Sequence, residues 1–259
     1  MATQEDHVLD GKVALITGGA GAIALATARR CAEQGARVVI ADLDQARLDL
    51  AAESLRGLGL DVVAVPVDVT SEPSVRALID RVAADHGRLD ILFTSAGVLV
   101  SGSVTETSLE DWERTLAVNL TGTFLCAKHA VPLMLAGGGG SIVLMSSTSG
   151  LVAEPATAAY CASKGGIVML GRQMAVDFAR AGVRVNVVCP GWIDTPFNTP
   201  AIERAGGIAA VTPFIEAMVP MGRQGHPDEV ADVVVFLASD RSRLMTGSVV
   251  VADGGLTAQ

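Results

Sequence analysis

Residues 13–24 read VALITGGAGAIA, an aliphatic run followed at once by closely spaced glycines. The run Val13–Thr17 is typical of a buried β-strand, and a helical pattern follows the glycines. Glycine lets a backbone turn sharply and approach a pyrophosphate, whose charge the free amides at the start of the next helix can meet. The stretch therefore predicts a strand, a glycine turn and a helix that together hold a dinucleotide.

The same alternation of short β-branched runs and longer amphipathic stretches continues along the chain and indicates repeated βαβ units. Right-handed crossovers would lay the helices on both faces of one parallel sheet, with a ligand crevice at the carboxyl ends of its strands. We expect strands at residues 13–17, 37–41, 62–67, 91–94, 142–145, 183–189 and 248–251, and helices at 23–34, 44–57, 74–85, around 112–135, 156–181 and 228–238. A chain of 259 residues without an evident linker suits one α/β domain over residues 1–259, with a Rossmann-type doubly wound sheet of about seven strands.

Composition limits the ligands. The formal charge is −9, and no cluster of Lys or Arg is present that could neutralise a phosphate backbone, so nucleic acid and anionic membranes are disfavoured as partners. The N-terminal MATQEDHVLD is acidic rather than a leader pattern, and no run of 18 apolar residues occurs. We expect a cytoplasmic protein that acts on a small molecule.

Cysteines and histidines point to neither disulfides nor a metal. The cysteines form no CxxC pair and the histidines lack metal-ligand spacing. Cys161 follows Tyr160 and could be a reactive thiol, but the role of a small apolar filler is favoured for it. The residues concerned are Cys31, Cys126, Cys161, Cys189, His7, His86, His129 and His226.

Tyr160 is the only tyrosine of the chain, and Lys164 follows four residues later, on the same face if the segment is helical. A phenol titrates near pH ~10, so proton exchange near neutrality needs about 4 kcal/mol of phenolate stabilisation. One ammonium at ~5 Å supplies about 3 kcal/mol with an effective dielectric constant of ~20. The pair predicts a proton donor and acceptor, with a second positive charge such as an oxidised nicotinamide nearby. A surface pair without a role remains the alternative from these two residues alone.

Asp42 closes the second expected strand, 24 residues after Gly18. A carboxylate there can bond both ribose hydroxyls of a dinucleotide and repels a 2′-phosphate. No Lys or Arg stands at Leu43 or in the glycine turn, so NAD is favoured over NADP. A surface turn residue is the alternative for Asp42.

From end to end, the chain resembles the short-chain dehydrogenase/reductase family. The motifs that carry the resemblance are the glycine turn at 17–24, Asp68-Val69, Ser95-Ala96-Gly97, the set Asn119, Ser147, Tyr160 and Lys164, Pro190-Gly191 with Thr195, and residues 222–240 with Asp253-Gly254-Gly255. The resemblance implies an NAD-dependent oxidoreductase that acts on CH–OH groups, transferring a hydride between NAD(H) and a secondary alcohol or ketone. It also implies a homotetramer, built by the helices before and around Tyr160 and by the last helix and strand.

Roles follow from the same resemblance. Ser147 would position the substrate oxygen, Tyr160 would exchange the proton, and Lys164 would lower the pKa of Tyr160 and bond the nicotinamide ribose. Asn119 would hold a water that links Lys164 to solvent, and Thr195 would bond the carboxamide. As alternatives, Ser147 closes a turn and Asn119 bridges strands. Expected cofactor contacts are Gly18, Gly21, Ala22, Ile23, Asp42, Asp68, Val69, Ala96, Gly97, Tyr160, Lys164, Pro190, Ile193 and Thr195.

The chain departs from the family pattern at two places. Alanine stands at positions 22 and 24, where glycine is usual. Ala24 is mild because that position mainly permits helix–strand packing, whereas the Ala22 methyl could push a pyrophosphate outward unless Gly21 takes the demanding backbone angles. Thr94 and Ser95 replace two asparagines and remove amides that tie strand ends together. The effect on cofactor affinity is not determined by the sequence.

The proline-rich connector 190–227 is long, and we expect it to form a substrate lid. Expected substrate contacts are Ser147, Val152, Ala153, Tyr160, Trp192 and Phe197, with Leu99, Phe214 and Met218 nearby. They are mostly apolar and include no basic residue, which favours an alicyclic, aromatic or aliphatic alcohol over a sugar phosphate. Glu154 and Asn198 could select hydroxyls, so polyols and sugars stay open.

Two other functions are compatible with parts of the sequence. A 3-oxoacyl thioester reductase is disfavoured by Asp42 and by the negative charge of the chain, since such enzymes use NADPH and dock acidic carriers. An inactive dinucleotide sensor or scaffold is suggested by Ala22 and Ser95, but the complete Asn-Ser-Tyr-Lys set argues against it. Substrate identity and physiological direction stay undetermined.

Overall fold

The computed structural model describes residues 7–258, so the start of the acidic N-terminal segment lies outside the described residues. Within them, seven parallel strands form one sheet in the order β3-β2-β1-β4-β5-β6-β7, which confirms the expected doubly wound fold. The strands are β1 Val13–Thr17, β2 Arg37–Asp42, β3 Val62–Pro66, β4 Ile91–Thr94, β5 Gly140–Met145, β6 Val183–Pro190 and β7 Val249–Ala252.

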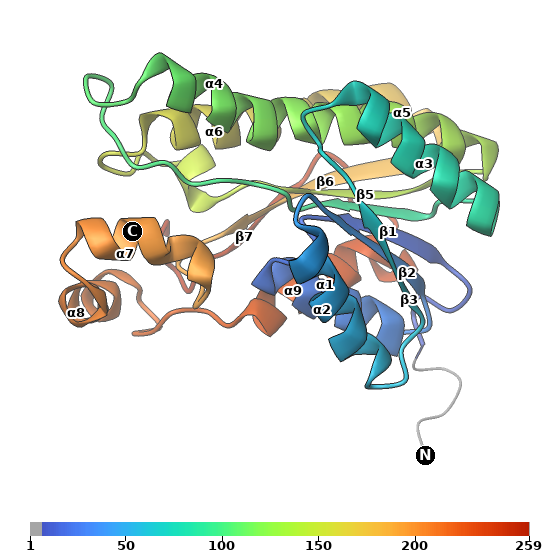
Figure 1. The fold of residues 1–259 in the computed structure, drawn as a ribbon, viewed down its shortest axis with the longest axis horizontal. Coiled ribbons are helices and arrows are strands. Elements are labelled where there is room, and N and C mark those ends of the chain that lie inside the picture. The colour runs from blue at the N-terminus through green and yellow to red at the C-terminus, as the bar shows by residue number, and fades with distance from the viewer. Residues whose placement is uncertain (1–6, 259) are drawn as a thin grey trace.

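Two apolar layers cover the sheet because alternate strand residues point to opposite faces. In β1, Val13 and Leu15 pack toward one cluster, whereas Ala14 and Ile16 pack toward the other. The first cluster lies under α3 Glu72–His86, α5 Gly122–Ala136 and α6 Ala158–Phe178, with α4 Leu109–Leu116 extending the same layer (Figure 1). The second lies under α1 Ala22–Glu33, α2 Gln45–Arg56 and α9 Pro227–Ala238.

The long helix expected around 112–135 is interrupted. Between α4 and α5 stands a π-helical turn, η2 Ala117–Thr121, which contains the fully buried Asn119. Single π turns inside α-helices are frequent at functional sites. The apolar pattern alone does not reveal the extra residue per turn, so the sequence predicted one uninterrupted helix.

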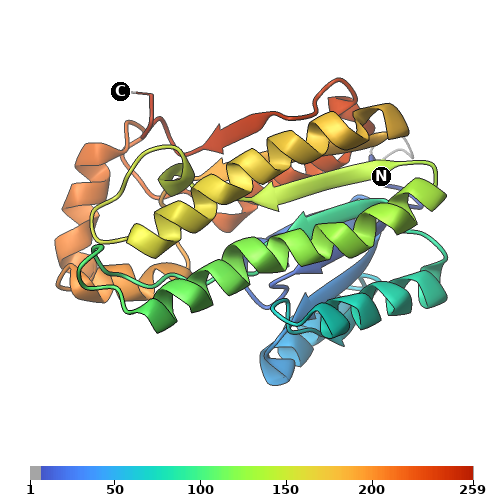
Figure 2. The same ribbon diagram turned by 90° about the horizontal axis from the view of Figure 1, so that it is seen from above.

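The connector 190–227 is largely helical rather than an extended loop. It contains α7 Thr199–Arg204 and α8 Ile208–Met218, and Pro200 lies at the first turn of α7, where its missing amide costs nothing. Figure 2 shows these orange helices beyond the arrowheads of the strands, at the end of the sheet where ligands bind in such folds. We call residues 190–227 the lid after the role that the sequence predicts for them, which stays a prediction.

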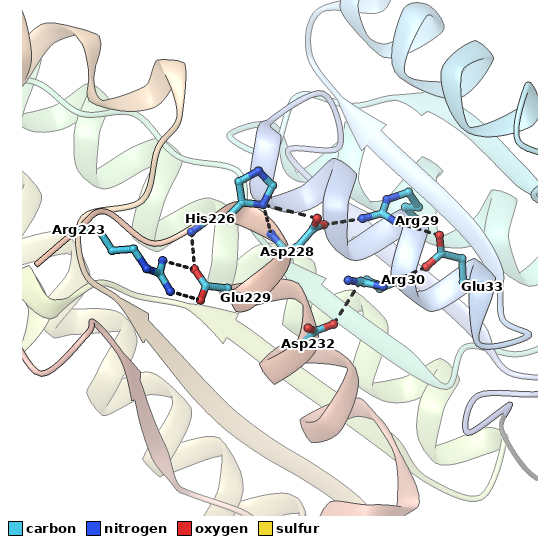
Figure 3. Close-up of polar contacts among 8 residues, drawn as sticks. All are labelled: Arg29, Arg30, Glu33, Arg223, His226, Asp228, Glu229 and Asp232. Carbon is cyan, nitrogen blue, oxygen red and sulfur yellow. Dashed lines mark hydrogen bonds and ion pairs between the residues drawn. The ribbon is translucent and has the colours of Figure 1, made fainter. Parts of the chain in front are cut away.

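Ion pairs join the end of the lid to the helix that begins at the glycine turn (Figure 3). Arg223 donates to both carboxylate oxygens of Glu229 at 2.8 Å, at the start of α9. From α9, Asp228 pairs with Arg29 of α1 at 2.6 Å and Asp232 pairs with Arg30 at 3.2 Å. The exit of the lid is therefore anchored to α1.

Among residues 7–258, no helix is both long enough and apolar enough to cross a membrane.

Candidate active site

A cavity of about 1570 Å³ lies at the carboxyl ends of the strands and reaches from Asp42 to the lid. Its volume exceeds that of a pocket for one drug-sized ligand and suits a dinucleotide with a small substrate. Of the predicted site residues, all except Asn119 line it: Gly18, Gly21, Ala22, Ile23, Asp42, Asp68, Val69, Ala96, Gly97, Ser147, Val152, Ala153, Tyr160, Lys164, Pro190, Trp192, Ile193, Thr195 and Phe197.

The glycine turn holds its demanding conformation at Gly18 and not at Gly21. Gly18 has φ +67°, and an added Cβ would stand 2.6 Å from the amide nitrogen of Ala96. Gly21 is the N-cap of α1 with an ordinary φ of −79°. The expectation that Gly21 takes the demanding angles was therefore wrong, because the close approach of Ser95 and Ala96, just after β4, falls at Gly18, three residues earlier.

The start of α1 has the features of an anion site. No side chain caps it and its first turn holds no acidic residue, so its first amides stay free and its positive dipole end is not neutralised. Gly21, Ala22 and Ile23, at this helix start, line the cavity. Ala22 borders the cavity, which stays open past its methyl group, and Ala24 is fully buried against the sheet. The residues present fit the pyrophosphate of a dinucleotide.

Two buried threonine hydroxyls lie at the ends of β1 and β4, where one of the departures from the family pattern occurs. Thr17 and Thr94 stand side by side in register on β1 and β4, and both are buried. Within the described residues, neither hydroxyl has a hydrogen-bond partner. The Thr94 side chain therefore makes no polar tie to β1, whereas the Ser95 amide still donates to the Thr17 carbonyl at 3.3 Å.

Asp42 accepts hydrogen bonds from the amides of Ala20 at 3.1 Å and Asp44 at 3.3 Å, at the edge of the cavity. The Arg47 guanidinium, from the first turn of α2, donates to the Ala20 carbonyl at 3.2 Å and also lines the cavity. The sequence search for a cation considered only Leu43 and the turn, and it missed Arg47. The prediction of NAD rather than NADP therefore depends on the carboxylate of Asp42 and not on the absence of a cation, and it stays a prediction.

Three side chains converge at the other end, Ser147 from the segment after β5 and Tyr160 and Lys164 from α6. The Lys164 ammonium lies 5.5 Å from the centre of the Tyr160 ring and donates to the Met145 carbonyl at 3.0 Å. The Ser147 hydroxyl forms a hydrogen bond with the Tyr160 hydroxyl, so a second hydroxyl group stands next to the phenol. From the lid, the Phe197 ring approaches the Tyr160 ring to 6.1 Å between centroids.

Burial dominates the electrostatics of this group. Desolvation raises the pKa of Tyr160 above its usual value, while the Ser147 hydrogen bond lowers it and the charge of Glu154 raises it. Desolvation lowers the pKa of Lys164 to about 8. In the protein alone, Lys164 therefore does not produce the predicted fall in the tyrosine pKa. Removing both groups from water costs free energy that the distance between them does not reveal.

Asn119 is engaged in structure. Its Oδ1 accepts from the Val98 amide at 2.8 Å, and its Nδ2 donates to the Val98 carbonyl and to Ser163 Oγ, both at 3.0 Å. These bonds hold the loop after β4 against α6, as in the bridging alternative. A role for Asn119 in a water relay stays a prediction.

Basic residues outside the expected set of substrate contacts also line the cavity. Arg114 of α4 and Arg204 of α7 are among the lining residues, and Arg204 pairs with Glu106 at 3.0 Å. The helical course of the lid brings Arg204 back toward the mouth, which its position in the sequence does not reveal.

A parallel sheet with an uncapped helix start at one end of the cavity and a buried Ser-Tyr-Lys group at the other defines a dinucleotide-binding oxidoreductase. The family described as "Enoyl-(Acyl carrier protein) reductase" matches residues 18–257. The chain belongs to the short-chain dehydrogenase/reductase family, and it is an oxidoreductase that uses a nicotinamide dinucleotide.

Relatives match over nearly the full length. Cis-4-hydroxycyclohexanecarboxylate dehydrogenase of Sinomonas cyclohexanicum is 42% identical, over 95% of this chain and 97% of the relative. D-threitol dehydrogenase of Mycolicibacterium smegmatis is 41% identical, over 97% of this chain and 95% of the relative. The crystal structure of gox2181 has a TM-score of 0.92 and 41% identity, covering 98% of this chain and 99% of that one.

Proposed function

We propose that the protein transfers a hydride between NAD(H) and a secondary alcohol or ketone. The observation that carries the proposal is the meeting of Ser147, Tyr160 and Lys164 in one cavity with the uncapped start of α1. Two similar proteins are named as dehydrogenases of compounds with a secondary hydroxyl group, which supports the same reaction class here.

In this proposal, the Tyr160 hydroxyl gives its proton to the substrate oxygen during reduction and takes it back during oxidation. Ser147 donates a hydrogen bond to the same oxygen and stabilises the charge that develops there. When bound, the nicotinamide cofactor supplies or accepts the hydride and, in its oxidised form, adds a positive charge near the phenol. The ammonium of Lys164 is a second positive charge close to Tyr160, and its Nζ can donate further hydrogen bonds besides the one to the Met145 carbonyl.

The Tyr160→Phe variant tests the proposal because it removes only the hydroxyl that exchanges the proton. We expect turnover to fall at least about a hundredfold, the usual contribution of a general acid or base. Binding of NADH, followed by its fluorescence, should persist. Full activity of Tyr160→Phe on secondary alcohols would contradict the mechanism.

The preference for NAD belongs to the same proposal and is supported by Asp42. A 2′-phosphate next to this carboxylate would meet a like charge. The ratio of kcat/KM for NAD and NADP measures the preference directly, and a ratio near one would contradict it.

A 3-oxoacyl thioester reductase is the second enzymatic reading, and the family description names an acyl carrier protein substrate. The net charge of −9 disfavours docking of an acidic carrier. Reduction of acetoacetyl-CoA at a rate above that of simple ketones would favour this reading.

We also propose a cytoplasmic homotetramer. The four thiols of each chain, Cys31, Cys126, Cys161 and Cys189, form no disulfide, which suits a reducing compartment such as the cytoplasm. Exposed apolar side chains suit subunit contacts: Leu109, Phe124, Met169 and Val176 on the α4–α6 layer, with Phe236, Leu244 and Val251 near β7. Light scattering measures the number of subunits.

A further inference from the structure

A carboxylate stands beside the substrate-positioning hydroxyl. Glu154 lies in the loop before α6 and lines the cavity. Its Oε2 accepts a hydrogen bond from the Ser149 hydroxyl at 2.6 Å. The Ser149 amide in turn donates to Ser147 Oγ at 3.1 Å. One residue therefore connects the carboxylate to the hydroxyl that receives the substrate oxygen.

The backbone around Glu154 is held by several contacts. The Thr157 hydroxyl donates to the Glu154 carbonyl at 2.8 Å. The Gly102 amide donates to the Ala156 carbonyl at 2.6 Å, and the Ala158 amide donates to the Gly102 carbonyl at 3.1 Å. Ala156 takes a φ of +54°, a left-handed conformation that is costly for alanine and that clusters at binding sites. The loop thus presents the carboxylate in one defined place.

The carboxylate has acceptor capacity to spare. Among residues 7–258, no group donates to its second oxygen, Oε1, and no cation pairs with it. Two cations that line the same cavity have other partners, because Lys164 donates to the Met145 carbonyl and Arg204 pairs with Glu106. Glu154 is half-buried, and a partly buried carboxylate gains from a partner that brings hydrogen-bond donors.

We propose that Glu154 binds a second hydroxyl group of the substrate, so that the protein selects diols and polyols over alcohols with a single hydroxyl and over hydroxy acids. The inference rests on the proposed alcohol dehydrogenase function. A hydroxyl beside the reacting carbon can donate to Oε1, whereas a substrate carboxylate would face a like charge. The two relatives differ in this respect, since one is named for a polyol and the other for a hydroxy acid.

The first test compares 2,3-butanediol with 2-butanol as substrates in the presence of NAD and of NADP. We expect the wild type to favour the diol in kcat/KM by roughly 10- to 100-fold, the range of a hydrogen bond to a charged group. In Glu154→Gln this ratio should fall roughly tenfold, because an amide is a weaker acceptor than a carboxylate. Glu203→Gln, which removes an exposed carboxylate on α7 that does not line the cavity, should keep the wild-type ratio.

The second test is a gain of activity, which misfolding cannot produce. Glu154→Lys should raise kcat/KM for cis-4-hydroxycyclohexanecarboxylate relative to cyclohexanol by at least about tenfold, since an ammonium now faces the substrate carboxylate. An unchanged diol ratio in Glu154→Gln together with no gain in Glu154→Lys would overturn the inference and leave the alcohol dehydrogenase function standing. Absence of turnover on every alcohol, with NADH still bound, would overturn the function and this inference with it.

Discussion

The two ends of the cavity are built differently. At the dinucleotide end, backbone groups of the sheet and of α1 form the wall, and Gly18 fits so closely against Ala96 that a side chain has no room. At the substrate end, the wall consists of side chains on the lid and on the loop before α6. Several of these are exposed, among them Val152 at 48% and Phe214 at 52%.

The difference separates cofactor binding from substrate choice. Backbone contacts do not depend on which side chains are present, so they persist while the substrate end changes. Relatives near 40% identity that share the fold are named for different alcohols, in line with this division. Replacement of the wall glycine Gly18 at the dinucleotide end should accordingly damage the fold, whereas replacements of side chains that line the cavity should alter specificity.

Gly18→Ala should have the largest effect on stability. The new methyl would combine a φ of +67° with a contact of 2.6 Å to backbone. We expect the free energy of unfolding to fall by about 3 kcal/mol or more, since overpacking adds to the conformational cost, and NADH binding to be lost. Gly59→Ala is the matched control, because φ is +78° but nothing lies within 4 Å of the added Cβ.

Chemical denaturation measures both glycine variants. The control should lose only about 1–2 kcal/mol for the left-handed conformation. Equal losses at both positions would show that the close approach of β1 and β4 is not what requires Gly18.

Lys164→Met should stabilise the protein. Burial lowers the pKa of Lys164 to about 8 from a usual value of 10.5. A lowered folded-state pKa means that stability is fully present above pH ~10.5 and is lost as the pH falls toward 8. At about 1.36 kcal/mol per unit, the charged lysine costs about 2–4 kcal/mol below pH 8.

The methionine variant should recover part of that free energy at pH 6–7 and differ little from the wild type near pH 10. Denaturation across this pH range measures the difference, with activity lost throughout. A variant less stable than the wild type at pH 6 would contradict the prediction.

Asp42→Asn should shift cofactor choice. Removing the carboxylate removes the like charge that a 2′-phosphate would meet, while Arg47 remains 3.2 Å from the Ala20 carbonyl. We expect the ratio of the Kd values for NADPH and NADH to fall by roughly tenfold, about 1.4 kcal/mol. Reversal of this gain in Asp42→Asn/Arg47→Ala would identify Arg47 as the phosphate partner, and no change in Asp42→Asn would remove the basis of the NAD preference.

Phe214→Ala should have the smallest effect on stability. Its ring is 52% exposed on α8 and lines the cavity. The free energy of unfolding should change by less than about 1 kcal/mol, while KM for apolar alcohols rises severalfold. Ile208→Ala, on the same helix at 56% exposure and away from the cavity, should leave KM unchanged. Equal KM shifts in both variants would show that the Phe214 ring makes no specific contact with the substrate.

Motifs along the chain predicted most of the fold and most of the residues that we expected to line the cavity. The glycine turn, Asp42, Ser147 and the Tyr160–Lys164 pair were found from spacing, and all of them line one cavity. The misses share a cause: Arg47 and Arg204 reach the cavity from helices whose orientation the sequence does not reveal.

What the order of residues establishes here is local: which segments are strands or helices, where the chain needs glycine, and that Tyr160 and Lys164 share a helix face. Such properties depend on neighbours within one or two turns. The pKa shifts of that pair, the engagement of Asn119 by Val98 and the place of Glu154 beside Ser149 depend on burial and on contacts that the folded chain alone creates. Desolvation and hydrogen bonding act through space, so folding was needed to set them.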